Sequence, residues 1–327
     1  MMSNIDVIDR KIIYQLSINS RQSNNQLAKK TGIKNNVVNY RIKKLEEHNI
    51  IRGYHTVTNT YSMFGTSTIR FHYSFDLVPL DIEQKINQFI CENKNISFAV
   101  RTFGAFDLSF LYHYHNIKDI YTFNLEFKKN FGSYIKKETI SHYIYEYYRP
   151  LEYLLKQPEK HKWITTGIAH IPSVSHQEIN ILSPLAENAR IPLYELAQKV
   201  GLTSETISKK IRHMIKTGII IGFRPSIDIT KLGYESYKLN ISLKNHQNRK
   251  AIIQYLEDNP HLIYIDFTFG ENDLEFEFHL KNLNELADII MDINTHFPDS
   301  IRHYNYVMQE KMLKFSYFPK EPSFEKP

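Results

Sequence analysis

The first sixty residues show a helical pattern of apolar positions. Apolar residues recur every three or four positions near the start, at Ile5, Ile8, Ile12, Ile13 and Leu16. A polar break at 19–23 ends this pattern, and Ser23 is a good N-cap for a short second helix that ends near Thr31. Gly32 supplies the turn into a third helix, from about Asn35 to Glu47.

An extended stretch follows the third helix. The inward positions of that helix are Val38, Ile42 and Leu45. The next residues, Ile50–Val57, are rich in β-branched and aromatic side chains, and we interpret them as a β-hairpin wing. Three short helices, a glycine turn between the second and third, and a wing predict a winged helix-turn-helix module.

Residues 61–155 combine the period-two pattern of strands with two helical patterns. Strands are expected at Thr66–Phe75, Ile96–Phe103, Leu108–His115 and Thr139–Tyr147, and helices at Leu80–Cys91 and Ile117–Phe131. This order, β-α-β-β-α-β, is typical of a ferredoxin-like domain.

The whole pattern then occurs a second time. At an offset of 169 residues, corresponding pairs include Arg21 with Arg190, Leu27 with Leu196, Gly32 with Gly201 and Ile42 with Ile211. Further on the offset falls to 166, so that 103–108 corresponds to 269–274. The second strand-helix pattern is expected at Ser236–Leu243, Arg249–Glu257, Leu262–Phe269, Leu274–Lys281, Leu283–Phe297 and Tyr304–Phe315. One two-part unit is therefore written twice.

The repeat divides the chain into five segments. We expect winged helix-turn-helix modules at 1–60 and 176–230, ferredoxin-like domains at 61–155 and 231–327, and a linker at 156–175. With 327 residues, the chain is long enough for several domains with their own cores. The expected fold class is α+β, with two winged helix-turn-helix modules alternating with two ferredoxin-like (βαββαβ) domains.

Charge follows the repeat. The chain has 41 Lys and Arg residues against 35 Asp and Glu, a net charge of +6. Residues 1–60 carry 10 basic and 4 acidic side chains, whereas residues 231–327 carry 11 and 15. Basic helical modules beside neutral or acidic domains indicate a polyanion as the partner of the modules.

The solvent-facing side of each third helix carries side chains suited to nucleic acid. In copy one the DNA-binding candidates are Asn35, Asn36, Asn39, Tyr40, Arg41, Lys43 and Lys44. In copy two they are Ser204, Thr206, Ser208, Lys209, Lys210 and Arg212. Asparagine can pair bidentately with adenine, whereas Arg and Lys suit guanine edges or phosphates. An ordinary solvated helix face would look similar, but the helix-turn-helix spacing favours double-stranded DNA as the partner.

The first module resembles the leucine-responsive/AsnC (feast/famine) transcription regulators. The similar segments are Ile5-Asp6-x-x-Asp9-x-x-Ile12, Ser20-Arg21, Leu27-Ala28-Lys29-Lys30-x-Gly32, Tyr40-Arg41-Ile42-Lys43-Lys44-Leu45-Glu46 and Ile50-Ile51-x-Gly53-Tyr54. Copy two is less similar, because Pro192 replaces the capping Ser23 and Glu205, which repels phosphate, lies in the first turn of its third helix. Copy one departs at Lys34, where the family usually has a Ser or Thr cap.

The resemblance implies a sequence-specific transcription regulator that responds to a small molecule such as an amino acid. It also implies that dimers form through the ferredoxin-like domains, so a tandem chain would be an intramolecular pseudo-dimer that can assemble into homo-oligomers. The family's effector site lies near a Gly-x-x-Asp turn, which is matched by Gly104 and Asp107 and by Gly270 and Asp273. Any tight turn selects Gly and Asp, so a purely structural role for these four residues stays open.

Other chemistry is not indicated. The sequence has no phosphate-cradling glycine loop, Gly-x-Ser-x-Gly or His-Glu-x-x-His, so we expect no catalytic residues, no cofactor and no enzyme. Cys91 is the single cysteine, which excludes a disulfide scaffold and fits the cytoplasm. His113 and His115 share a strand face without a third ligand, so no metal site is expected. No apolar run approaches the roughly 20 residues that span a bilayer, so no membrane partner is expected.

One enzyme family remains as the alternative. Siroheme decarboxylases resemble a pair of these same two-part units, and they carry His-Asn-Tyr-x-Arg on the second strand and Trp-Phe on the third. The corresponding stretch here, at 98–103, is Phe-Ala-Val-Arg-Thr-Phe, and the single tryptophan, Trp163, lies in the linker. The alternative function is therefore a siroheme decarboxylase-like tetrapyrrole enzyme built on the same tandem fold.

Overall fold

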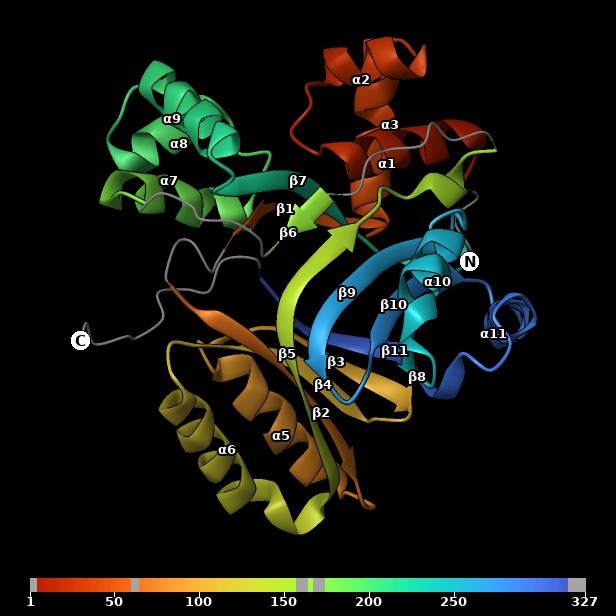
Figure 1. The fold of residues 1–327 in the computed structure, drawn as a ribbon. Helices are drawn as coiled ribbons and strands as arrows, with labels where there is room; N and C mark the ends of the chain where they lie inside the picture. The colour runs from red at the N-terminus through yellow and green to blue at the C-terminus, as the bar shows by residue number, and fades with distance from the viewer. Residues whose placement is uncertain (1–4, 60–64, 157–163, 167–173, 317–327) are drawn as a thin grey trace.

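Two helical modules lie at one end of the molecule, and a strand-rich body lies at the other (Figure 1). The computed structural model describes residues 5–59, 65–156, 164–166 and 174–316. Helices and strands mix in every part of it, as an α+β fold requires.

Each helical module contains three helices and one strand. The first module consists of α1 (Val7–Ile18), α2 (Asn24–Thr31), α3 (Asn35–Glu47) and β1 (Ile51–Thr58). The second consists of α7 (His176–Glu187), α8 (Leu193–Val200), α9 (Ser204–Lys216) and β7 (Ile220–Ile227). Ser23 caps α2 through a reciprocal capping box with Gln26, and Gly32 ends it with a left-handed φ of 72°. The predicted order of three helices and the Ser23 cap are confirmed.

The expected β-hairpin wing is wrong. Residues 51–58 form one strand, β1, and its partner is β7 of the other module. The antiparallel ladder runs from Ile51 opposite Ile227 to Thr58 opposite Ile220. The stretch holds no two-residue turn signal that would fold it back on itself, so the equivalent strand of the second copy pairs with its backbone groups instead.

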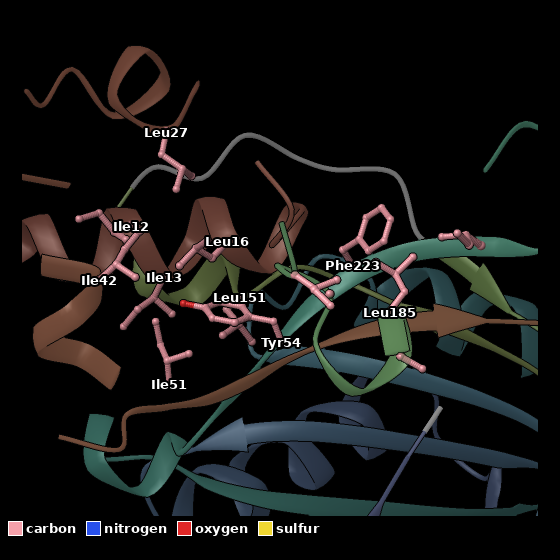
Figure 2. Close-up of a cluster of buried hydrophobic side chains, with 14 of the residues drawn as sticks. Ile12, Ile13, Leu16, Leu27, Ile42, Ile51, Tyr54, Leu151, Leu185 and Phe223 are labelled. Atoms are coloured by element: carbon pink, nitrogen blue, oxygen red, sulfur yellow. The ribbon is translucent and has the colours of Figure 1, made fainter. Parts of the chain in front are cut away.

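The two modules share one hydrophobic core. Buried side chains of the first module, such as Ile12 and Leu16, belong to the same cluster as Leu185 and Phe223 of the second. Figure 2 shows these four residues together with Leu151, which comes from the segment that leaves the body. The modules are therefore packed together as one unit, which we call the head.

The strand-rich body contains two equivalent halves. The first comprises β2 (Ser67–Phe75), α5 (Leu80–Glu92), β3 (Ile96–Gly104), β4 (Leu108–Tyr114), α6 (Ile117–Phe131) and β5 (Ile135–Tyr148). The second comprises β8 (Glu235–Leu243), α10 (Arg249–Leu256), β9 (Leu262–Gly270), β10 (Leu274–Leu280), α11 (Leu283–His296) and β11 (Ile301–Phe315). The predicted order β-α-β-β-α-β is present in each half.

The two halves close into a single barrel of eight antiparallel strands. The strand order is β5-β2-β4-β3 in the first half and β11-β8-β10-β9 in the second. The seams β3–β11 and β5–β9 join the halves. The expected pair of separate ferredoxin-like domains is not confirmed, because the outer strands of each half, whose backbone groups would otherwise lack partners, pair with the other half.

The barrel has an apolar outer layer and a polar interior. Phe71 and Tyr73 of β2 are buried in the cluster that includes α5 and α6. Arg70 alternates with them, and its Nη1 lies 2.7 Å from Oδ2 of Asp266 on β9 and 2.7 Å from Oε2 of Glu275 on β10. Neither β9 nor β10 pairs with β2, so these ion pairs cross the barrel interior and join the two halves.

Part of the expected linker is structured. Ile164–Thr166 form a short strand, β6, which extends the sheet by pairing with β5. Trp163 and most of the other residues of the 156–175 segment lie outside the described residues. Before this segment, Leu151 and Leu154 are buried in the core of the head.

Candidate DNA-binding interface

Helix α3 packs into the first module and presents a polar face to solvent. Val38, Ile42 and Leu45 hold it in the core, each at most 5% exposed. The exposed candidates on this helix are Asn35, Asn36, Asn39, Tyr40, Lys43 and Lys44. Tyr40 is 64% exposed. Contact of its apolar ring with a partner surface would be favourable, because it would remove the ring from water.

Arg41 differs from the other candidates on α3 because its guanidinium is already engaged. Its Nη1 lies 2.7 Å from Oδ2 of Asp6 and 3.2 Å from both carboxylate oxygens of Asp9. Burial alone would lower the pKa of Arg41, but its hydrogen bond to the Asp6 carboxylate and the charge of Asp9 raise it. Arg41 therefore ties α3 to α1, and its expected contact with a base or a phosphate stays a prediction.

Asn39 lies at the junction of α2 and α3. Nδ2 of Asn24, at the start of α2, donates to Oδ1 of Asn39 over 3.2 Å. This bond restricts the rotation of the Asn39 amide, while the side chain stays exposed. An amide held in one orientation can pair with a base edge at a lower entropic cost.

Helix α9 of the second module is capped better than α3 but has an acidic residue, Glu205, in its first turn. Oγ1 of Thr203 accepts from the Thr206 N–H over 3.2 Å, whereas Lys34 makes no such bond at α3. Lys209 is exposed but lies 2.8 Å from Glu205. Arg212 is exposed and Lys210 is half-buried, as are Ser204, Thr206 and Ser208.

In the second module, the residues at the equivalent positions of the first and third helices also carry opposite charges. Glu178 corresponds to Asp9 at the offset of 169, and Lys210 corresponds to Arg41. Burial would raise the pKa of Glu178, but hydrogen bonds from Ser175 and the charge of Lys210 lower it. The charge of Lys210 therefore acts on Glu178 across the two helices.

Two equivalent arginines fasten the modules to each other. Nη1 of Arg21 donates to the carbonyl oxygens of Ala189 and Ile191. In return, Nη1 of Arg190 donates to the carbonyl oxygens of Ser20, over 2.8 Å, and Gln22, over 3.3 Å. Burial and the charge of Arg190 lower the pKa of Arg21. The sequence repeat paired these arginines but gave no sign that they reach across to opposite modules.

Backbone bonds follow the same reciprocity. The Ser20 N–H donates to the Phe223 carbonyl over 2.9 Å, and the Ala189 N–H donates to the Tyr54 carbonyl over 2.9 Å. The guanidinium of Arg21 also lies over the ring of Phe223, and that of Arg190 over the ring of Tyr54. The relative position of α3 and α9 is therefore set by matched contacts.

The head is attached to the barrel through the end of β5. The Tyr148 hydroxyl donates to the Ser17 carbonyl over 3.4 Å, and the Leu151 N–H donates to Oγ of Ser17 over 3.1 Å. The guanidinium of Arg224 in β7 lies 3.5 Å from the centre of the Tyr148 ring. A shift of β5 would therefore reach α1 and β7 together.

The two Gly-x-x-Asp turns lie at the barrel seams. Gly104 has a φ of 120°, and a Cβ there would lie 2.5 Å from the Tyr306 carbonyl oxygen of β11. At Gly270 a Cβ would lie 2.7 Å from the Ile140 carbonyl oxygen of β5. Both glycines are needed because a strand of the other half passes too close for any side chain.

The aspartates of these turns bind backbone. Oδ2 of Asp107 accepts from the Phe75 N–H over 2.7 Å, and Oδ2 of Asp273 accepts from the Leu243 N–H over 2.6 Å. Each carboxylate thus ties its turn to the end of the first strand of its half. Asp273 also lies 3.6 Å from Nδ1 of His246. In each half, the glycine and the aspartate of the turn therefore have a structural role.

Comparison with known proteins places these features in a family. A family profile described as winged helix-turn-helix DNA-binding matches residues 5–52 and 175–221. The proline dehydrogenase transcriptional activator of Rhodobacter capsulatus is 37% identical over 137 residues, which are 41% of this chain and 89% of the relative. The regulatory protein AsnC of Haemophilus influenzae is 29% identical over 111 residues, 34% of this chain and 74% of the relative.

The chain belongs to the leucine-responsive/AsnC family of transcription regulators. About two fifths of this chain cover most of the Rhodobacter capsulatus relative, so the relative is about half as long as this chain. This ratio is expected if the chain is a tandem repeat of one family unit. The predicted family and its duplication are thus confirmed.

This family member shares its overall fold with a solved structure that it matches over nearly its whole length. The siroheme decarboxylase NirDL has a TM-score of 0.60 and 14% sequence identity, with 95% of this chain and 93% of that chain covered. At this identity the likeness concerns the fold alone. It shows that two fused units with this arrangement occur in another protein.

Two further observations limit the chemistry of this family member. Within the described residues, no three His, Cys, Asp or Glu side chains are grouped so that they could hold a metal ion. His113, one of the two strand histidines, instead bonds to the hydroxyls of Ser97 and Thr68 over 2.7 and 3.0 Å. Across the described segments, every helix is too short or too polar to span a membrane.

Proposed function

We propose that the protein is a sequence-specific transcription regulator in which α3 reads the major groove of double-stranded DNA. The observation that carries this proposal is the exposed row of Asn35, Asn36 and Asn39 beside Lys43 on a helix whose other face is buried. Amide groups suit adenine edges, and the ammonium suits guanine or phosphate. Tyr40 and Lys44 flank the row, and Arg41 holds it in place through α1.

We assign a lesser share of DNA binding to α9. Ser204, Thr206 and Ser208 offer hydroxyls for phosphate contacts, and Arg212 adds a charge. The Glu205 carboxylate pairs with Lys209 and repels phosphate, and this is the reason for the lesser share.

The domain assignment follows from the same proposal. We assign 1–60 and 176–230 to the DNA-binding head, and 61–155 and 231–327 to the barrel, with 156–175 between them. The strand orders β5-β2-β4-β3 and β11-β8-β10-β9 support a ferredoxin-like origin for each half. In this assignment the closed barrel is the dimer interface of the family made within one chain.

DNA binding is tested by selecting sequences from random duplexes with the full chain and titrating the selected site. Binding should weaken by about 10³-fold or more between roughly 50 and 200 mM salt if six or more phosphates are contacted. Asn39→Ala should reduce discrimination at one or two positions by about 1–3 kcal/mol. Asn130→Ala, an exposed asparagine on α6, is the matched control. No protected DNA at low salt would contradict the regulator function.

We also propose that an amino acid acts as effector beside the Gly104–Asp107 and Gly270–Asp273 turns. Asp107 is half-buried, and a carboxylate in that position suits an α-ammonium group. These turns lie on the seams between the halves, so a ligand there would bear on how the halves meet.

Calorimetry with a panel of amino acids tests the effector. Asp107→Asn and Asp273→Asn keep the shape of each turn while removing the charge, and the loss of heat in one variant would identify the working site. Coupling is reciprocal, so DNA should change the effector's affinity by the factor by which the effector changes DNA affinity. If the unaltered protein gives no heat with any amino acid, the turns are structural only.

A tetrapyrrole enzyme is the second candidate, favoured by the whole-chain likeness to NirDL. The stretch expected to match the siroheme decarboxylase motif, residues 98–103 of β3, contains no histidine and no tyrosine. We therefore prefer the regulator. Titration with an iron tetrapyrrole decides between them, since a new Soret-type band that saturates at one equivalent would favour the enzyme.

A further inference from the structure

The head has a pseudo-twofold axis that relates its two recognition helices. His55 of β1 lies opposite Arg224 of β7 in the ladder, and these two residues are equivalent at the offset of 169. On either side, Tyr54 lies opposite Pro225 and Thr56 lies opposite Phe223, as a twofold axis through the central pair demands.

Contacts away from the ladder obey the same axis. The Asn59 N–H donates to the Ile219 carbonyl over 3.0 Å, and the Asp228 N–H donates to the Ile50 carbonyl over 2.8 Å. Asp228 and Ile219 are the equivalents of Asn59 and Ile50. The Arg21 and Arg190 bonds across the modules are a further matched set. Helices α3 and α9 therefore have symmetric positions in one rigid head.

The side chains at these symmetric positions are not the same. Asn36 corresponds to Glu205, and Tyr40 corresponds to Lys209. Glu205 and Lys209 form an ion pair 2.8 Å long on α9, a contact that Asn36 and Tyr40 cannot make on α3. A glutamate can accept from cytosine N4 and repels phosphate, whereas an asparagine amide pairs with adenine.

The third difference concerns the central reading position. Asn39 corresponds to Ser208, so an amide with a donor and an acceptor faces one half-site and a single hydroxyl faces the other. Asn24 orients the Asn39 amide, whereas the Ser208 carbonyl accepts from Nε of Arg212 on its own helix. At equivalent positions, the side chains of the two helices thus differ in both hydrogen-bonding groups and size.

From these observations we infer that the protein recognises a directional operator. The site consists of two half-sites of unlike sequence, one for α3 and one for α9, and the head binds it in one orientation. A symmetric homodimer presents two identical helices and so selects a palindrome. This inference rests on the proposed DNA-binding function, and it adds that the fused chain sets the direction in which it sits on the duplex.

The first test is selection followed by competition between three duplexes: the selected site, the palindrome of its stronger arm and the palindrome of its weaker arm. The selected site should bind at least about tenfold more tightly than either palindrome, because mismatches in one arm are each costly. Equal or tighter binding to a palindrome overturns the directional operator while leaving the regulator function intact. Failure to bind any duplex overturns both.

Exchange variants supply the second test. Glu205→Asn, Ser208→Asn and Lys209→Tyr, made together, give α9 the side chains that α3 has at these three positions, and preference should shift toward the palindrome of the α3 arm. The converse variant, Asn36→Glu with Asn39→Ser and Tyr40→Lys, should shift it to the palindrome of the other arm. All six positions lie away from the buried core. An unchanged asymmetric preference in both variants would overturn the inference.

A third test reads orientation directly. Cys91 is the single cysteine, so Cys91→Ser with Glu47→Cys places one thiol at the exposed end of α3. An iron chelate attached to this thiol should cleave the duplex beside one arm only. Cleavage of equal strength beside both arms would show that the head binds in both directions.

Discussion

Arg21 and Arg190 are equivalent residues of the two modules, and each donates hydrogen bonds to backbone carbonyl groups of the module that contains the other. The exchange is symmetric. Arg21 bonds to Ala189, the residue before Arg190, and Arg190 bonds to Ser20, the residue before Arg21. A charge-assisted bond to a carbonyl that is shielded from water is stronger than an exposed one. These two guanidinium groups therefore hold the two modules of the head together, and we call Arg21 and Arg190 the clasp.

Arg190→Ala should loosen the clasp. Two carbonyl oxygens lose their donor, so the free energy of unfolding should fall by about 1–3 kcal/mol. DNA affinity should fall as well, because α3 and α9 would no longer be held at one separation. Urea denaturation and DNA titration measure the two effects. Arg302→Ala, an exposed arginine of β11, is the control, and an equal effect there would contradict the role of the clasp.

Arg41 and Lys43 should separate positioning from contact. Arg41→Ala should lower the free energy of unfolding by about 1–2 kcal/mol, because the buried Asp9 loses its partner. Lys43→Ala should change stability by less than about 0.5 kcal/mol but reduce the slope of log affinity against log salt by about one. If Arg41→Ala alters the slope in the same way, Arg41 contacts phosphate after all.

Arg70→Met should damage the barrel. Burial alone would lower the pKa of Arg70, but the charges of Asp266 and Glu275 raise it, so the guanidinium is needed as a cation. Removing it leaves Lys238 as the remaining cation paired with those two buried carboxylates, which should cost roughly 3–5 kcal/mol of stability. The control is Lys85→Met, which breaks an exposed pair with Asp81 and should cost less than about 1 kcal/mol.

His113 should make stability depend on pH below neutrality. Burial lowers the pKa of His113 to about 4, so the folded protein keeps the imidazole neutral while the unfolded chain takes up a proton below about pH 6.5. The free energy of unfolding should therefore fall as pH drops from 6.5 to 4, by roughly 3 kcal/mol from this residue.

The variant His113→Gln isolates this share. Urea denaturation at several pH values between 7 and 4 should show a smaller decline than in the unaltered protein. His279, whose pKa burial lowers to about 3, adds a decline in the same direction that both proteins keep. The exposed His176→Gln is the control, and an identical pH profile for all three proteins would contradict the assignment.

Gly104→Ala should open the seam between β3 and β11. The added Cβ would collide with the Tyr306 carbonyl oxygen, and the positive φ adds strain, so the loss should exceed about 1 kcal/mol. Hydrogen exchange should rise at the Ala105 N–H, which donates to that same carbonyl. Gly222→Ala, where no neighbouring atom lies within 4 Å of the new carbon, is the matched control.

The sequence predicts local structure well because local causes decide it. The Ser23 cap, the Gly32 turn and the spacing of Val38, Ile42 and Leu45 place α2 and α3 correctly. The helix expected at 117–131 has the observed bounds. Six of the seven candidates on α3 are exposed, and the seventh, Arg41, is half-buried and paired with Asp6 and Asp9.

What the sequence does not reveal are contacts between the copies. A repeat shows that two units are alike, but their hydrophobic pattern is the same whether each sheet stands alone or joins the other. The pairing of β1 with β7 and the closing of the barrel are therefore missed. Gly104 looks like an ordinary turn residue until the Tyr306 carbonyl is seen beside it, because that carbonyl is about two hundred positions away in the chain.

The ion pairs across the barrel have a consequence for how such a chain can change over generations. In a homodimer every substitution enters both sides of the axis at once, so a cation that crosses the interface must suit its own twin's surroundings. Here Arg70 faces Asp266 and Glu275, whose equivalents in the first half are Val100 and Ser109. Because the halves are joined in one chain, one copy of the unit can carry a cation and the other copy the carboxylates that pair with it. With respect to these ion pairs, neither half can replace the other.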